Sequence, residues 1–256
     1  MEVKKELTIQ EKHDILFDIL KDIDGFCRAN NIKYSLSDGT MLGAIRHGGF
    51  IPWDDDADIC MLREDFDRFA ATYKSNKYHM LYKTCNEDEL FYGGFIKVND
   101  PSTYVENDNK TNLTKFGVTV DIFPFDPVPE DKKEQKKYMH SVRRIDNRLY
   151  HSQKRDFLSI FKSFRHSSGN WWRKLHDTIR LGNIKYKDSP LVGQSVCVRD
   201  DRVVLTREMF ERIVDIPFNG YSFYGFEDAK GYLEFMFGPD YMTPKKWNHG
   251  TVIYRK

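Results

Sequence analysis

The chain has few cysteines, no long apolar segment and almost no net charge. Its four cysteines share no Cys-x-x-Cys spacing and no nearby histidine pair, which argues against both a disulfide framework and a zinc site. It contains no run of about eighteen apolar residues, so we expect no membrane-spanning helix. The first residues also lack the apolar segment of a signal peptide, and we therefore expect a cytoplasmic protein.

The balance of charge bears on the class of partner. With 40 basic and 39 acidic residues the formal net charge is +1, so nucleic acid is not expected as a bulk electrostatic partner. Hydrophobic residues make up 40% and aromatic residues 14% of the chain, which is a globular composition. A length of 256 residues fits one domain over 1–256, or two intimately packed lobes.

Hydrophobic periodicity predicts a mixture of helices and strands. The capping-box spacing of Thr8-Ile9-Gln10-Glu11 opens a helix that ends near Asn30. Residues 117–123 alternate as a strand does, and a charged helix is expected over about 130–150. This order predicts the α+β class, with a mixed sheet, flanking helices and a helical insertion at about 130–195. Further strands are expected at 56–62, 79–83, 94–98 and 103–105, and further helices at 63–73, 154–187 and 227–237.

Four acidic residues crowd into five positions at Asp54, Asp55, Asp56 and Asp58. In a strand, residues two apart face the same way, so Asp54, Asp56 and Asp58 are expected on one face and Asp55 on the other. Carboxylates on one face can share a hard divalent cation, and Mg²⁺ (with Mn²⁺ as an alternative) would also bind a phosphate group of a substrate. A solvated loop or an adventitious calcium site is the competing interpretation.

Asp121 is the natural third carboxylate of such a site. It lies in the apolar segment GVTVDIFPF, where Val120 and Ile122 flank it. A lone carboxylate in an apolar strand is costly unless it is paired, protonated or bound to metal.

A short turn at Gly39-Thr40 precedes the acidic cluster and could hold a phosphate with its backbone N–H groups. Arg46 could clamp a phosphate with two hydrogen bonds, and His47 could bind phosphate or transfer a proton. The competing interpretations are a surface arginine, a loop histidine and, for Trp53, a place in the core.

These segments resemble a known family. GTMLGAIRHGGFIPWDDDADI, residues 39–59, is similar to the signature of the LicD/fukutin family. VTVDIFPFDPVP, residues 118–129, resembles the second block of that family, and GYLEFMFGPDYMTPKKWNHG, residues 231–250, resembles its C-terminal block.

The resemblance implies a nucleotidyltransferase-like fold and transfer of a phospho-alcohol from a CDP-linked donor to a glycan. It favours phosphocholine from CDP-choline, moved onto a teichoic acid, lipopolysaccharide or capsule precursor with release of CMP; another CDP-linked group such as ribitol or glycerol phosphate is the alternative. It implies Asp54, Asp56, Asp58 and Asp121 as metal ligands, with catalytic roles for the last three. It places Gly39, Thr40, Arg46, His47 and Trp53 near the donor.

Other functions share these residues. An NTP-dependent nucleotidyltransferase would use the same carboxylates, and a metal-dependent glycan-binding module would use them without turnover. The helical segment at about 130–195 is expected to face the acceptor. Basic residues of its first helix could rest on the inner face of an anionic membrane, where a lipid-linked acceptor would lie; a solvated helix is the competing interpretation.

Overall fold

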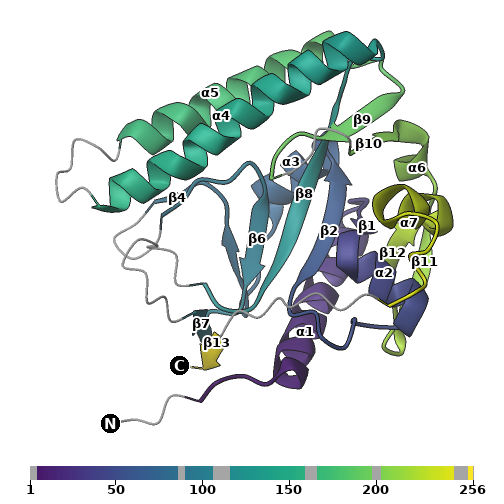
Figure 1. The fold of residues 1–256 in the computed structure, drawn as a ribbon. Coiled ribbons are helices and arrows are strands. Elements are labelled where there is room, and N and C mark those ends of the chain that lie inside the picture. The colour runs from purple at the N-terminus through teal and green to yellow at the C-terminus, as the bar shows by residue number, and fades with distance from the viewer. Residues whose placement is uncertain are drawn as a thin grey trace.

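The fold was analysed in a computed structural model, which describes residues 5–85, 90–105, 116–158, 166–197, 203–244 and 253–255. It is built around one curled mixed sheet with helices on its faces (Figure 1). The predicted α+β class is confirmed. In the described part of the chain, no helix combines the length and the apolar character needed to cross a bilayer.

The central sheet has the strand order β1-β2-β8-β6-β3, with β9 also pairing with β8 and β10 with β9. β2 and β8 run parallel, whereas every other pairing in this sheet is antiparallel. Their buried β-branched and aromatic residues suit strands covered on both faces. The strands are β1 (Ser35–Leu36), β2 (Ala57–Leu62), β3 (His79–Leu81), β6 (Ile96–Asn99), β8 (Thr119–Pro127), β9 (Leu191–Gln194) and β10 (Val204–Thr206).

α1 (Ile9–Ala29) begins at the predicted capping box, in which Thr8 and Glu11 bond reciprocally. Its apolar residues recur every three or four positions, so one stripe, including Leu16, Ile19 and Ile23, is fully buried against the sheet. α2 (Asp38–His47) and α3 (Arg63–Thr72) flank β2 in sequence and pack beside it.

The predicted helical segment is a pair of long helices, α4 (Lys132–Leu158) and α5 (His166–Lys185), which run side by side along one edge of the molecule (Figure 1). They enclose a second apolar cluster that includes Val142, Leu149 and Leu175. Trp171 and Trp172 pack against this cluster. The proposed contact of α4 with a membrane stays a prediction.

The C-terminal third forms a hairpin of β11 (Ile213–Phe218) and β12 (Tyr221–Phe226), followed by α7 (Ala229–Phe237), which packs against α2. The chain returns beside its start, where β13 pairs with β7 and the Leu7 N–H donates to the Ile253 carbonyl. The remaining elements are β4 (Thr84–Cys85), β5 (Leu90–Phe91), β7 (Thr103–Val105), α6 (Arg207–Glu211) and β13 (Ile253–Arg255).

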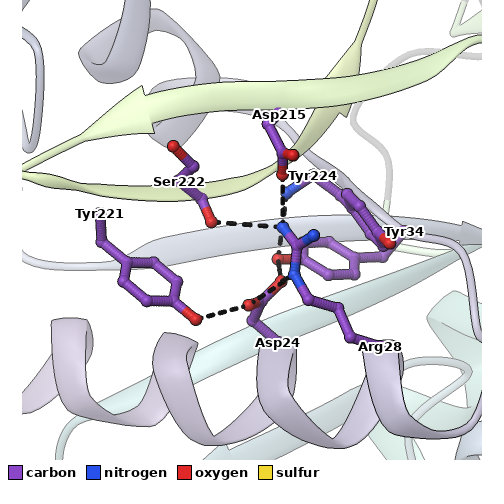
Figure 2. A network of polar contacts seen from close by, with 7 residues as sticks. All are labelled: Asp24, Arg28, Tyr34, Asp215, Tyr221, Ser222 and Tyr224. Carbon is purple, nitrogen blue, oxygen red and sulfur yellow. Dashed lines mark hydrogen bonds and ion pairs between the residues drawn. The ribbon is translucent and has the colours of Figure 1, made fainter.

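A buried carboxylate ties α1 to this hairpin (Figure 2). The carboxylate of Asp24, with no exposed side-chain surface, accepts hydrogen bonds from the Arg28 guanidinium, Tyr34 and Tyr221 at 2.7 to 2.9 Å. Arg28 continues the network to Asp215 at 2.6 Å. Because every oxygen of Asp24 is satisfied, the network fixes the position of the hairpin and of α7 behind it.

We expect Asp24→Ala to lower the free energy of unfolding by about 2–3 kcal/mol, because it removes the acceptor of the buried Tyr34 hydroxyl and of Tyr221, and one of the two carboxylate partners of Arg28. Urea unfolding followed by circular dichroism measures the loss. Asp18→Ala, which removes an exposed carboxylate of the same helix paired with Lys21 and Lys77, should cost less than about 1 kcal/mol. Equal losses in the two variants would contradict the assignment of Asp24.

Candidate active site

A cavity of about 390 Å³ lies where the amino end of β2 meets the first turn of α2 and the turn after α7. One wall comes from the signature segment and the other from the C-terminal block. The lining residues are Gly39, Leu42, Arg46, Ile51, Trp53, Asp54, Asp56 and Asp58 on the first wall, and Phe237, Asp240, Tyr241 and Thr243 on the second.

The acidic cluster divides as its alternation predicts. Asp54, Asp56 and Asp58 line the cavity, whereas Asp55 points away and forms an ion pair with Lys12 of α1 at 2.9 Å. β2 begins only at Ala57. It follows a turn in which the Asp54 N–H donates a hydrogen bond to the Ile51 carbonyl. The alternation therefore continues through the extended residues that precede β2.

Carboxylates in this cavity hold their protons more tightly than free ones do. Removal from water raises the pKa of Asp56 to about 7, and the charges of Asp54, Asp121 and Asp55 add to the effect. The same desolvation raises the pKa of Asp54 and, well above its usual range, that of Asp58. Burial likewise raises the pKa of Asp38, at the start of α2, to about 6, although Asp38 does not line the cavity. Among the described residues, the positive charge near the cluster is thus too small to offset its carboxylates.

Asp121 lies directly beside Asp58, its register partner in the parallel β2–β8 pair. It does not line the cavity; instead both of its oxygens accept hydrogen bonds from the Lys97 ammonium, at 2.6 and 2.5 Å. Lys97 was missed from the sequence, although a lysine between Ile96 and Val98 in an apolar strand was a signal that a buried carboxylate opposes it.

Gly39 and Thr40 open α2 beside these carboxylates. A Cβ at Gly39 would lie 2.6 Å from Oδ2 of Asp54, so a glycine lets the helix approach the acidic cluster. The Thr40 hydroxyl accepts a hydrogen bond from the Asp58 N–H at 2.8 Å. Thr40 is thus buried and fixes the position of Asp58 relative to α2.

Arg46 lines the cavity, and its Nη1 donates to the main-chain carbonyl of Tyr241 at 2.8 Å. His47 is not on the lining; its ring meets the edge of Trp53 with centroids 6.1 Å apart. Burial and the neighbouring charge of Arg46 lower the pKa of His47. Of these three residues expected near the donor, Arg46 and Trp53 reach the cavity directly and His47 supports Trp53.

The donor set fits a hard divalent cation. Three cavity carboxylates supply oxygen ligands, and their raised pKa values show that a positive charge would relieve them. Within the described residues, no three His, Cys, Asp or Glu side chains already surround one point as metal ligands. The fit therefore rests on donor chemistry and on the shared cavity, with Asp121 one strand away.

A model of the LicD/FKTN/FKRP nucleotidyltransferase domain matches residues 31–164. The chain belongs to this family. The matched region contains all the lining residues of the first wall, including Asp54, Asp56 and Asp58, together with Lys97 and Asp121.

Individual relatives agree with this assignment. The lipopolysaccharide cholinephosphotransferase LicD of Haemophilus influenzae is 35% identical over 153 residues, which cover 59% of this chain and 57% of the relative. An uncharacterized protein of Rickettsia typhi is 32% identical over 147 residues, covering 50% of this chain and 47% of that protein. This LicD-family chain thus spans about half the length of the relatives that it matches.

The crowded carboxylates lead to a prediction about stability. A carboxyl group whose pKa is higher in the folded than in the unfolded protein binds more protons when folded, so it stabilises the fold only at low pH. For Asp56, this contribution to the free energy of unfolding is lost as the pH rises from 3.8 to about 7. With a chelator present at pH 8, Asp56→Asn should therefore raise the free energy of unfolding by about 1 kcal/mol, less than the full shift because the residue retains solvent contact.

Thermal unfolding at pH 8 and pH 4 checks this expectation, and the gain should vanish at the lower pH. Asp55→Asn is the matched control: it removes the partner of Lys12 and should destabilise the protein at pH 8. A loss of stability in both variants would show that Asp56 is not under electrostatic strain.

Proposed function

We propose that this LicD-family protein transfers phosphocholine from CDP-choline to a hydroxyl of a cell-surface glycan, with release of CMP. The observation that carries the proposal is the cavity, in which the carboxylates of the family signature converge beside the half-buried Asp121. The H. influenzae relative is a lipopolysaccharide cholinephosphotransferase, which supports the choice of phosphocholine. Teichoic acid, lipopolysaccharide and capsule precursors are the proposed acceptors.

Asp56 and Asp58, with Asp54 and Asp121 beside them, would hold Mg²⁺ or Mn²⁺. When bound, the cation would neutralise charge on the donor pyrophosphate. Arg46 would add a positive charge at the same cavity. The protein would thus position the donor phosphorus and offset its charge, which supplies most of the acceleration in phosphoryl transfer.

In the proposed reaction the acceptor oxygen forms a bond to the phosphorus of phosphocholine, and the bond from that phosphorus to the CMP oxygen breaks. The hydroxyl proton passes to a carboxylate, for which Asp121 is our preferred assignment. Lys97, which donates to both oxygens of Asp121, would have to release one of them for this step.

A second function has one observation in its favour, because the matched family model is described as a nucleotidyltransferase domain. Such an enzyme would attack the α-phosphate of an NTP and release pyrophosphate. The two reactions use the same carboxylates but differ in their leaving group, so products separate them.

The experiment offers the protein CDP-choline, CDP-ribitol, CDP-glycerol and CTP in parallel, with Mg²⁺ and either lipopolysaccharide or teichoic acid as acceptor. We expect CMP from CDP-choline, no pyrophosphate from CTP, and loss of turnover on addition of EDTA. Asp56→Asn, Asp58→Asn and Asp121→Asn should each lower the rate by at least ~100-fold, because the first two would weaken binding of the cation that offsets charge at the reacting phosphate and the third would remove the proposed proton acceptor.

Asp55→Asn serves as the neighbouring control and should keep most of its activity per folded molecule, since Asp55 points away from the cavity toward Lys12. Pyrophosphate release from CTP would instead establish the nucleotidyltransferase. Metal-dependent binding of glycan without any released nucleotide would establish a binding module.

A further inference from the structure

The turn after α7 forms a wall of the cavity, although it lies outside the region matched by the family model. That match ends at residue 164, whereas Phe237, Asp240, Tyr241 and Thr243 all face the cavity. In Figure 1 α7 lies on the same side of the sheet as α2, against which it packs. A segment distant in sequence therefore completes the site.

This wall is held in a defined shape. Gly238 has φ +88°, a conformation that favours glycine, and its carbonyl accepts from the Tyr241 N–H at 3.2 Å. The Thr243 N–H in turn donates to the Asp240 carbonyl at 2.9 Å. Arg46, on the opposite wall, donates to the Tyr241 carbonyl. Arg46 thus acts as a positioning residue that links α2 to the turn.

Aromatic side chains line both walls of this cavity. Trp53 comes from the signature segment, Phe237 is the last residue of α7, and Tyr241 lies in the turn that follows it. Phe237 is 40% exposed, although it is a large apolar side chain. In contrast, Phe123 and Phe125, two other aromatic residues close to the family blocks, are buried in the main core. Unlike these two, Trp53, Phe237 and Tyr241 retain solvent-exposed surface and line the cavity.

The charge of the lining selects among ligands for this surface. Among the described lining residues, carboxylates (Asp54, Asp56, Asp58 and Asp240) outnumber guanidinium groups, of which Arg46 supplies one. Aromatic faces beside such carboxylates favour a quaternary ammonium over a neutral polyol or a neutral base.

We infer that Phe237, Tyr241 and Asp240, together with Trp53, form the subsite that recognises the cationic head group of the donor. This inference rests on the proposed function, which supplies a CDP-linked donor. It assigns donor selectivity to the C-terminal turn, while the carboxylates of the signature segment bind the phosphate end through the cation.

The test measures binding by isothermal titration calorimetry with Mg²⁺, using CDP, CDP-choline and the analogue CDP-3,3-dimethylbutanol, in which carbon replaces the charged nitrogen. We expect CDP-choline to bind about tenfold more tightly than its uncharged analogue. Phe237→Leu and Tyr241→Leu should abolish this preference and leave the affinity for CDP unchanged. Tyr241→Leu keeps the bond from Arg46, because the acceptor is a main-chain carbonyl.

Phe235→Leu is the matched control, since Phe235 is 50% exposed on the same helix but does not line the cavity; it should keep the preference. Melting temperatures verify that each variant is folded. Equal binding of CDP-choline and its analogue to the unmodified protein would overturn the inference alone. Phe237→Leu could instead bind CDP more weakly and still prefer CDP-choline to its uncharged analogue. That result would also overturn the inference, and it would indicate that Phe237 contacts the cytosine ring. Failure of the protein to bind any of the three ligands would overturn the proposed function itself.

Discussion

The parallel pairing of β2 with β8 places two carboxylates, Asp58 and Asp121, side by side across neighbouring strands. The antiparallel strand β6 then brings Lys97 opposite Asp121, and the Thr40 hydroxyl of α2 fixes the Asp58 N–H. Any slip of the β2 register by one residue would turn Asp58 to the opposite face of the sheet and replace it with an apolar side chain. The site therefore depends on a strand register that the surrounding core enforces.

The carboxylates at the two ends of this strand pair differ in how their charge is compensated. At the carboxyl ends, Asp126 receives two hydrogen bonds from the Arg63 guanidinium and one from Asn183, so its charge is fully compensated within the protein. At the amino end, Asp56 and Asp58 face a cavity with desolvation and mutual repulsion instead. Compensated pairs such as Arg63–Asp126 serve the fold, whereas an uncompensated cluster costs stability and points to a ligand that supplies the missing charge.

Local patterns predicted the fold class, the limits of α1 and the opposite orientation of Asp55, because periodicity and capping act within a few residues. The sequence did not reveal that Lys97 binds Asp121, because strand order is a tertiary property. It likewise placed Arg46 near the donor without showing that its guanidinium holds the Tyr241 carbonyl, 195 residues away in sequence. Contacts that join distant segments carry no local periodic signal, so these parts of the site required the structure.

The cavity also separates two physical tasks between two segments. The signature segment brings carboxylates together at a strand end, where a rigid register can keep like charges close in spite of their repulsion. The end of α7 and the turn at Gly238 contribute the exposed Phe237 and the half-buried Tyr241. Arg46 joins the two, and the Asp24 network anchors the hairpin that leads into α7. The proposed cation site and the proposed head-group subsite thus lie on different segments, which pack together through α2 and α7 and share one cavity.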